Sequence, residues 1–131
     1  MLKVALISEH ASPLPIPGSI DCGGQNVYVA HLAMQLAQLG YEIDIFTRCD
    51  SPSQPEVLEW KPGIRVVHVP AGPARFVPKE QLLPYMDEFI SFMIDFAESQ
   101  PVPYDLMHAN FFMSGLVAQR VKQALDIPYV I

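Results

Sequence analysis

The sequence is poor in cysteine, in basic residues and in long apolar runs, and each shortage excludes a class of protein. Two cysteines, Cys22 and Cys49, occur in 131 residues, which excludes a disulfide framework and leaves free thiols, as in a reducing cytoplasm. The eight Lys and Arg residues stand singly in a chain of net charge −6, which argues against nucleic acid as a partner. No apolar run approaches the roughly 20 residues that cross a bilayer, and acidic Glu9 follows the apolar start too closely for a signal peptide. We therefore expect a cytoplasmic protein with no transmembrane segment.

Several motifs of common chemistries are also missing. The sequence contains no P-loop, and no G-x-G-x-x-G joins the first predicted strand to the first predicted helix, which argues against a nicotinamide site. Its four histidines show no metal-ligand spacing with carboxylates, and no serine lies in a nucleophile elbow. We expect neither a bound cofactor nor a metal ion.

What the chain does contain is enough apolar sequence for one domain. Half of its residues are apolar and 17% are charged, the balance of a globular protein. Thirteen prolines divide it into short segments. Apolar runs predict strands, and residues spaced three and four apart predict helices. The expected strands are 2–8, 41–47, 64–69, 105–109 and 127–131, and the expected helices are 24–39, 79–99 (interrupted at Pro84) and 113–125. Residues 50–63 hold three prolines and are expected to form a surface excursion without regular structure.

This alternation predicts an α/β fold: a Rossmann-like, doubly wound, mostly parallel sheet with helices on both faces. Ligands of such sheets bind outside the carboxyl ends of the strands. We therefore expect Ser8-Glu9-His10, the Gly23-Gly24-Gln25-Asn26 segment and His108-Ala109-Asn110 to meet at one edge.

The Gly23-Gly24 pair at the start of the first helix is the strongest candidate site. A helix start offers unpaired N–H groups and the positive end of the helix dipole, which suit a phosphate, and Asn26 adds a directional side chain. A simple tight turn is the alternative. His10 and His108 at strand ends can bind or orient a ligand or serve structure alone, whereas His31 and His68 are interpreted as structural. Ser114 near a helix start is a candidate cap.

These segments, with Phe46-Thr47-Arg48 and Asp105 to Gly115, resemble the N-terminal domain of retaining GT-B glycosyltransferases of family 4. Sucrose synthases, sucrose-phosphate synthases and the inositol-phosphate glycosyltransferases of mycothiol biosynthesis are the most similar in pattern. The resemblance implies an acceptor-side domain spanning 1–131, which faces a nucleotide-sugar domain across a cleft. It implies transfer of a hexosyl unit from a nucleotide sugar to a sugar, sugar-phosphate or cyclitol acceptor, without a metal.

The same resemblance implies roles for single residues. Gly24 and Asn26 would lie against donor phosphates or the acceptor, and Lys79 would pair with an acceptor phosphate. The chain departs from the inositol-phosphate enzymes and the sucrose-phosphate synthases at Asn110 and Phe111, where they carry His and Tyr, and it thereby loses the tyrosine hydroxyl as a phosphate contact. The expected substrate-binding residues are Gly23, Gly24, Asn26, His10, Lys79, His108, Asn110 and Phe111.

The nucleotide-sugar domain and the histidine that assists catalysis in these relatives have no counterpart in 1–131. We therefore expect this fragment to contain no catalytic residue, to be inactive alone, and to self-associate through its uncovered faces. A non-catalytic module that binds a partner or a phosphorylated small molecule is the rival hypothesis, and a nucleotide binder unrelated to sugar transfer is a third.

Overall fold

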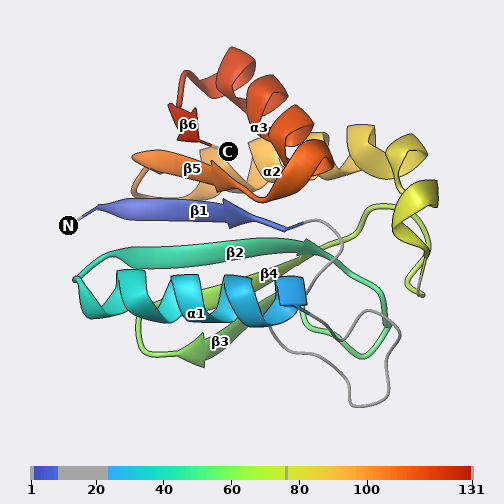
Figure 1. The fold of residues 1–131 in the computed structure, drawn as a ribbon. Helices are drawn as coiled ribbons and strands as arrows, with labels where there is room; N and C mark the ends of the chain where they lie inside the picture. The colour runs from blue at the N-terminus through green and yellow to red at the C-terminus, as the bar shows by residue number, and fades with distance from the viewer. Residues whose placement is uncertain (1, 9–23, 76, 131) are drawn as a thin grey trace.

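The computed structural model describes residues 2–8, 24–75 and 77–130. They form one twisted sheet with a helix layer on each face (Figure 1). The elements in chain order are β1 (Lys3–Ile7), α1 (Gly24–Gln38), β2 (Glu42–Arg48), β3 (Val57–Lys61), β4 (Ile64–Val69), the 3₁₀ turns η1 (Lys79–Gln81) and η2 (Leu83–Tyr85), α2 (Met86–Ser99), β5 (Leu106–Ala109), α3 (Phe111–Leu125) and β6 (Tyr129–Val130).

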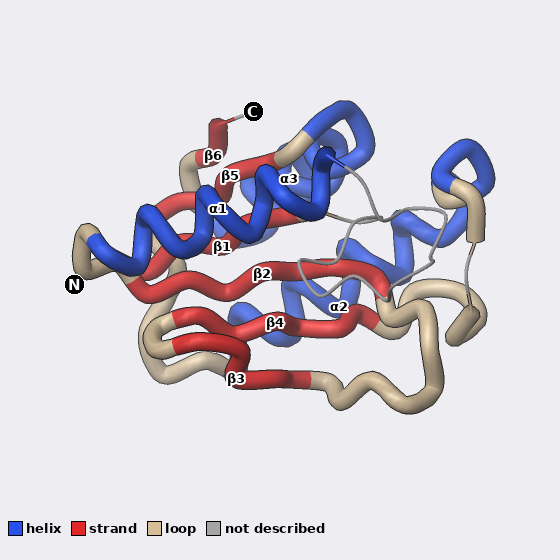
Figure 2. The backbone as a smooth tube through the Cα atoms, turned by 60° about the horizontal axis from the view of Figure 1, so that its bottom comes forward, coloured by secondary structure: helices blue, strands red, loops and turns tan. Residues whose placement is uncertain are grey.

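The sheet has the strand order β3-β4-β2-β1-β5-β6, and every neighbouring pair is parallel except β3 with β4. Parallel strands need crossover connections, and helices supply most of these crossovers. α1 covers one face, while α2 and α3 cover the other (Figure 2). The predicted Rossmann-like, doubly wound fold class is therefore confirmed.

Two apolar cores lie on the two faces of the sheet. β1 is buried at every position, so its alternate side chains enter both cores. Leu6 and Ile45 pack under α1 with Val29 of that helix. Ile7 and Phe46, one position further along their strands, pack instead against α2 and α3. The near-continuous apolar run of β1 follows from this burial on both faces.

The prediction for residues 50–63 is wrong at its end, because β3 forms there as an antiparallel edge strand. Val57 to Lys61 pairs with β4 through the tight Pro62-Gly63 turn, in which Gly63 has a φ of 79°. A Pro-Gly pair between two short β-prone runs is a hairpin signal. An edge strand is only partly buried, so its apolar pattern is weak. The prolines that led to the prediction lie before the strand or in the turn.

Two helix starts also differ from the prediction. Residues 79–85 form two 3₁₀ turns and α2 begins at Met86, because Pro84 prevents one continuous helix. α3 begins at Phe111, two residues earlier than expected. Ser114 is fully buried inside that helix, so it is not the cap. Asn110 occupies the N-cap position instead.

Candidate functional site

The carboxyl ends of β1, β2, β4 and β5 meet at one edge of the sheet. Figure 1 shows that α1 and α3 both begin at this edge, next to the tips of the arrows, and that the segment from 79 to 85, drawn in yellow, lies there as well. Neither α1 nor α3 has an acidic residue in its first turn, so no carboxylate there offsets the positive ends of the helix dipoles. This edge is therefore suited to an anionic ligand.

A row of buried polar residues crosses the sheet at the same edge. The parallel register pairs Thr47 with His68, and Ser8 and Asn110 directly follow the paired Ile7 and Ala109. The exposed fractions of these side chains are 0% for Ser8, 1% for Thr47, 3% for His68 and 4% for Asn110. Thr47 and His68 follow residues that face α2 and α3, so they face the α1 side of the sheet.

Asn110 connects two strands at this edge through hydrogen bonds. Its side-chain amide donates a hydrogen bond to the Ile7 carbonyl oxygen at 3.0 Å, and its backbone N–H donates to the same oxygen at 3.1 Å. These bonds tie the β5–α3 turn to the end of β1. The bond to Ile7 uses one of the two Nδ2 hydrogens, so Asn110 keeps a second N–H donor and its side-chain oxygen acceptor for a ligand.

His108 is half-buried on β5, on the α1 side of the sheet. Its Nδ1 is buried and has no hydrogen-bond partner among the described residues. Burial lowers the pKa of His108 below its ordinary value of 6.5, because a charged imidazolium is poorly solvated there. His108 is therefore a neutral imidazole at neutral pH, with one ring nitrogen that donates a hydrogen bond and one that accepts.

This lowered pKa predicts a pH-dependent stability. In the unfolded chain His108 takes up a proton near pH 6.5, whereas in the folded chain it stays neutral at that pH. The free energy of unfolding should therefore fall as the pH decreases from 7 through 6.5. Urea titrations at pH 7.5, 6.5 and 5.5 measure the effect. His108→Gln should flatten the dependence, whereas His31→Gln, at an exposed position of α1, should keep it. Equal slopes in native and His108→Gln protein would contradict the prediction.

The other predicted site residues are placed less fully. His10 and Gly23 lie outside the described residues. The backbone at Gly24, Asn26, Lys79 and Phe111 lies at the edge described above, and the side chains of the last three lie outside the description. The structure thus brings several predicted residues together at one edge, and their roles as ligand contacts stay predictions.

Sequence reasoning missed two residues at this edge, Arg48 and His68. The Arg48 guanidinium is buried and donates to the main-chain carbonyl oxygens of Ala71 and Pro73, contacts that have no sequence signature. His68 was interpreted as structural, and its ring Nδ1 does contact the Pro55 carbonyl oxygen at 2.7 Å. Its Nε2 is nevertheless buried without a partner among the described residues. His68 pairs with Thr47 in the register and lies near the carboxyl end of β4.

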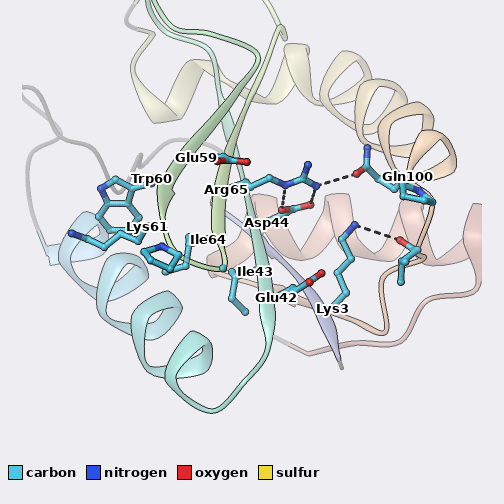
Figure 3. A pocket seen from close by; sticks show the side chains of 14 residues that line it. Lys3, Glu42, Ile43, Asp44, Glu59, Trp60, Lys61, Ile64, Arg65 and Gln100 are labelled. Carbon is cyan, nitrogen blue, oxygen red and sulfur yellow. Dashed lines mark hydrogen bonds and ion pairs between the residues drawn. The ribbon is translucent and has the colours of Figure 1, made fainter.

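A hollow of about 700 Å³ lies at the opposite edge, at the amino ends of the parallel strands (Figure 3). Three of its charged groups make hydrogen bonds within the protein: Arg65 donates to Asp44 and to Gln100, and Lys3 donates to the Val102 carbonyl oxygen. Parallel α/β sheets bind ligands at the carboxyl edge. We therefore assign the candidate site to that edge and not to this hollow.

Metal-binding clusters and membrane-spanning helices are both absent from residues 2–8, 24–75 and 77–130. These residues contain no group of three or more His, Cys, Asp and Glu that could hold a metal ion. None of their helices combines the length and the apolar character that crossing a membrane requires.

Comparison with known proteins agrees with this geometry. The family model of the glycosyl transferase 4-like domain matches residues 23–131. D-inositol 3-phosphate glycosyltransferases from Corynebacterium aurimucosum and Kineococcus radiotolerans are each 43% identical over 98% of this chain, which spans 31% and 30% of their lengths. The sucrose-phosphate synthase of Thermosynechococcus elongatus superposes with a TM-score of 0.89 at 32% identity, covering 98% of this chain and 32% of that chain. The chain therefore belongs to the glycosyl transferase 4-like family, as its sequence motifs and its fold both indicate.

Proposed function

We propose that this chain is the acceptor-side domain of a retaining glycosyltransferase that moves a hexosyl unit from a nucleotide sugar to a small acceptor. One observation carries the proposal: two helix starts, the 79–85 segment and His108 converge at the carboxyl edge of the sheet, in a chain of this family. The matched relatives are about three times as long as this chain, so in our proposal a second domain supplies the nucleotide-sugar site.

A phosphorylated cyclitol or sugar is the acceptor class that this edge favours. The relatives are named for inositol 3-phosphate and sucrose phosphate, and the unneutralised starts of α1 and α3 favour an anion. The proposal assigns Gly23, Gly24 and Asn26 to the α1 lip of the site, Lys79 to the acceptor phosphate, and His10, His108, Asn110 and Phe111 to the remaining wall. The absence of a metal requirement and a cytoplasmic location belong to the same proposal.

The named relatives do not favour the rival hypothesis of a non-catalytic module, because they are glycosyltransferases.

A direct test of the proposed function is sugar transfer by the full-length protein that contains this chain. Purified protein is incubated with UDP- and GDP-sugars and with inositol 3-phosphate, fructose 6-phosphate or unphosphorylated inositol. We expect transfer to a phosphorylated acceptor, retention of the anomeric configuration, and no loss of rate with EDTA. Absence of transfer from every donor would contradict the proposal.

A further inference from the structure

A buried arginine at the candidate edge holds one loop through the backbone of that loop. Arg48, the last residue of β2, is 5% exposed. Its Nη1 donates to the carbonyl oxygens of Ala71 at 3.2 Å and Pro73 at 2.7 Å, and its Nη2 donates to that of Arg75. The planar fork of a guanidinium can reach acceptors spread along a loop, which the point charge of a lysine cannot do. The Arg48 side chain can therefore bind three carbonyl oxygens of loop 70–75 at once.

An aromatic ring holds the same loop from another element. Gly72 has a φ of 73°, and a Cβ atom built there would lie 2.7–3.0 Å from atoms of the Tyr85 ring. Such distances leave no room for a side chain, so the ring packs directly on the glycine backbone. Tyr85 is the N-cap of α2. The loop is thus held between the end of β2 and the start of α2.

The held loop leads directly to Lys79. After Arg75 the chain returns to the core at Val77, which is 5% exposed and belongs to the same apolar cluster as Leu82. The first 3₁₀ turn then begins at Lys79, and the Gln81 N–H donates to the Pro78 carbonyl oxygen at 2.8 Å. The backbone of Lys79 is therefore positioned by the contacts that hold loop 70–75 and Val77.

We propose that Arg48 and Tyr85 form a clamp on loop 70–75 that sets the position of Lys79, and that Arg48 is thereby a positioning residue for the phosphate of the acceptor. The role of Lys79 rests on the proposed function. The clamp itself rests on the hydrogen bonds of Arg48 and the packing of Tyr85 on Gly72. Arg48 acts through the loop and through Lys79, so its loss should weaken acceptor binding more than the chemical step.

Kinetics of the full-length protein test the positioning role, with inositol 3-phosphate and the best UDP-sugar as probes. Arg48→Lys keeps a positive charge but loses the fork. We expect it to raise the acceptor KM about tenfold, while the kcat and the donor KM stay within about twofold. A displacement of a binding group by one ångström can cost roughly a hundredfold in rate, and the expected shift of Lys79 is smaller than that. Gly72→Ala, which pushes against the Tyr85 ring and leaves Arg48 intact, should change the acceptor KM in the same direction.

Arg65→Lys is the matched control, because Arg65 also donates through a fork but lies at the opposite edge, against Asp44 and Gln100. It should lower the melting temperature without changing the acceptor KM. Combining Arg48→Lys with Lys79→Met should add less than about twofold to the acceptor KM of Lys79→Met alone, since coupled residues are not additive. Full additivity, or an equal rise in donor KM, would overturn the positioning role.

Amide hydrogen exchange tests the clamp without any substrate. The N–H groups of Ala71 and Arg75 are bonded within the loop, each at 2.8 Å, to the carbonyl oxygens of Val69 and Pro73. Both should exchange at least about tenfold faster in Arg48→Lys, since local opening sets their rate. Unchanged exchange overturns the clamp. Faster exchange with an unchanged acceptor KM overturns the positioning role. Faster exchange in a protein that transfers no sugar supports the clamp and counts against the proposed function instead.

Discussion

Replacing Asp44 with alanine is expected to lower the free energy of unfolding by about 3 kcal/mol, because it removes the acceptor shared by two donors. Asp44 is 2% exposed on β2. It accepts hydrogen bonds from Arg65 Nε at 2.8 Å and Nη2 at 2.6 Å, and from the Tyr104 hydroxyl (Figure 3 shows the Arg65 pair). This network joins β2, β4 and the chain segment before β5.

The two donors contribute unequally to the loss. The Tyr104 side chain is 4% exposed, so its hydroxyl would lose its acceptor in a dry environment. Burial also raises the pKa of Tyr104, which keeps the hydroxyl protonated and a donor. The Arg65 side chain is 32% exposed and would regain water, which reduces its share of the penalty. The expected loss therefore lies at the low end of the range for breaking a buried ion pair.

Urea titration at pH 7 measures the effect, with Asp44→Asn as the conservative control. Asparagine keeps an acceptor oxygen for Tyr104, so it should cost less than alanine. Asp44→Leu combined with Tyr104→Phe and Arg65→Met should recover much of the stability, because an apolar replacement of a whole buried network leaves no unpaired group. A loss below about 1 kcal/mol in Asp44→Ala would show that the network contributes no more than an ordinary hydrogen bond.

Replacing Lys79 with methionine in the full-length protein is expected to lower kcat/KM for inositol 3-phosphate about a hundredfold. A hydrogen bond between an ammonium group and a phosphate is charge-assisted at both ends and contributes roughly 2–3 kcal/mol. Transfer to an unphosphorylated acceptor lacks this contact and should change little. Initial rates with both acceptors, at saturating donor, measure the difference.

Lys61→Met is the matched control for Lys79. Lys61 is a surface lysine whose Nζ lies 5.4 Å from the centre of the Trp60 ring, beside the hollow at the amino edge of the sheet. Its replacement removes the same charge far from the proposed acceptor and should leave both rates unchanged. Equal losses for the two acceptors in Lys79→Met would refute a phosphate contact and favour a general structural role.

The order of elements and the fold class could be predicted from the sequence because parallel strands buried on both faces leave a strong local pattern. β1 reads as a near-continuous apolar run for this reason. β2 instead alternates apolar and polar residues, which is the other pattern that predicts a strand. β3 could not be recognised in the same way, since an edge strand is half-exposed and its apolar alternation is weak. The sequence feature that marks β3 is the Pro62-Gly63 turn. It predicts a strand only when the segments on both sides of the turn are considered as a pair, as β3 and β4 are in the structure.

The sequence by itself indicated the family, the edge of the sheet proposed for the site, and the candidate residues that local motifs contain, because each of these depends on residues close together in the chain. Only the tertiary structure decided how those residues are held. Asn110 donates to Ile7 across 103 positions, and Arg48 reaches the carbonyls of a loop 23 to 27 positions away. Main-chain acceptors are the same in every residue, so no sequence pattern reveals which carbonyl oxygens a buried side chain will meet.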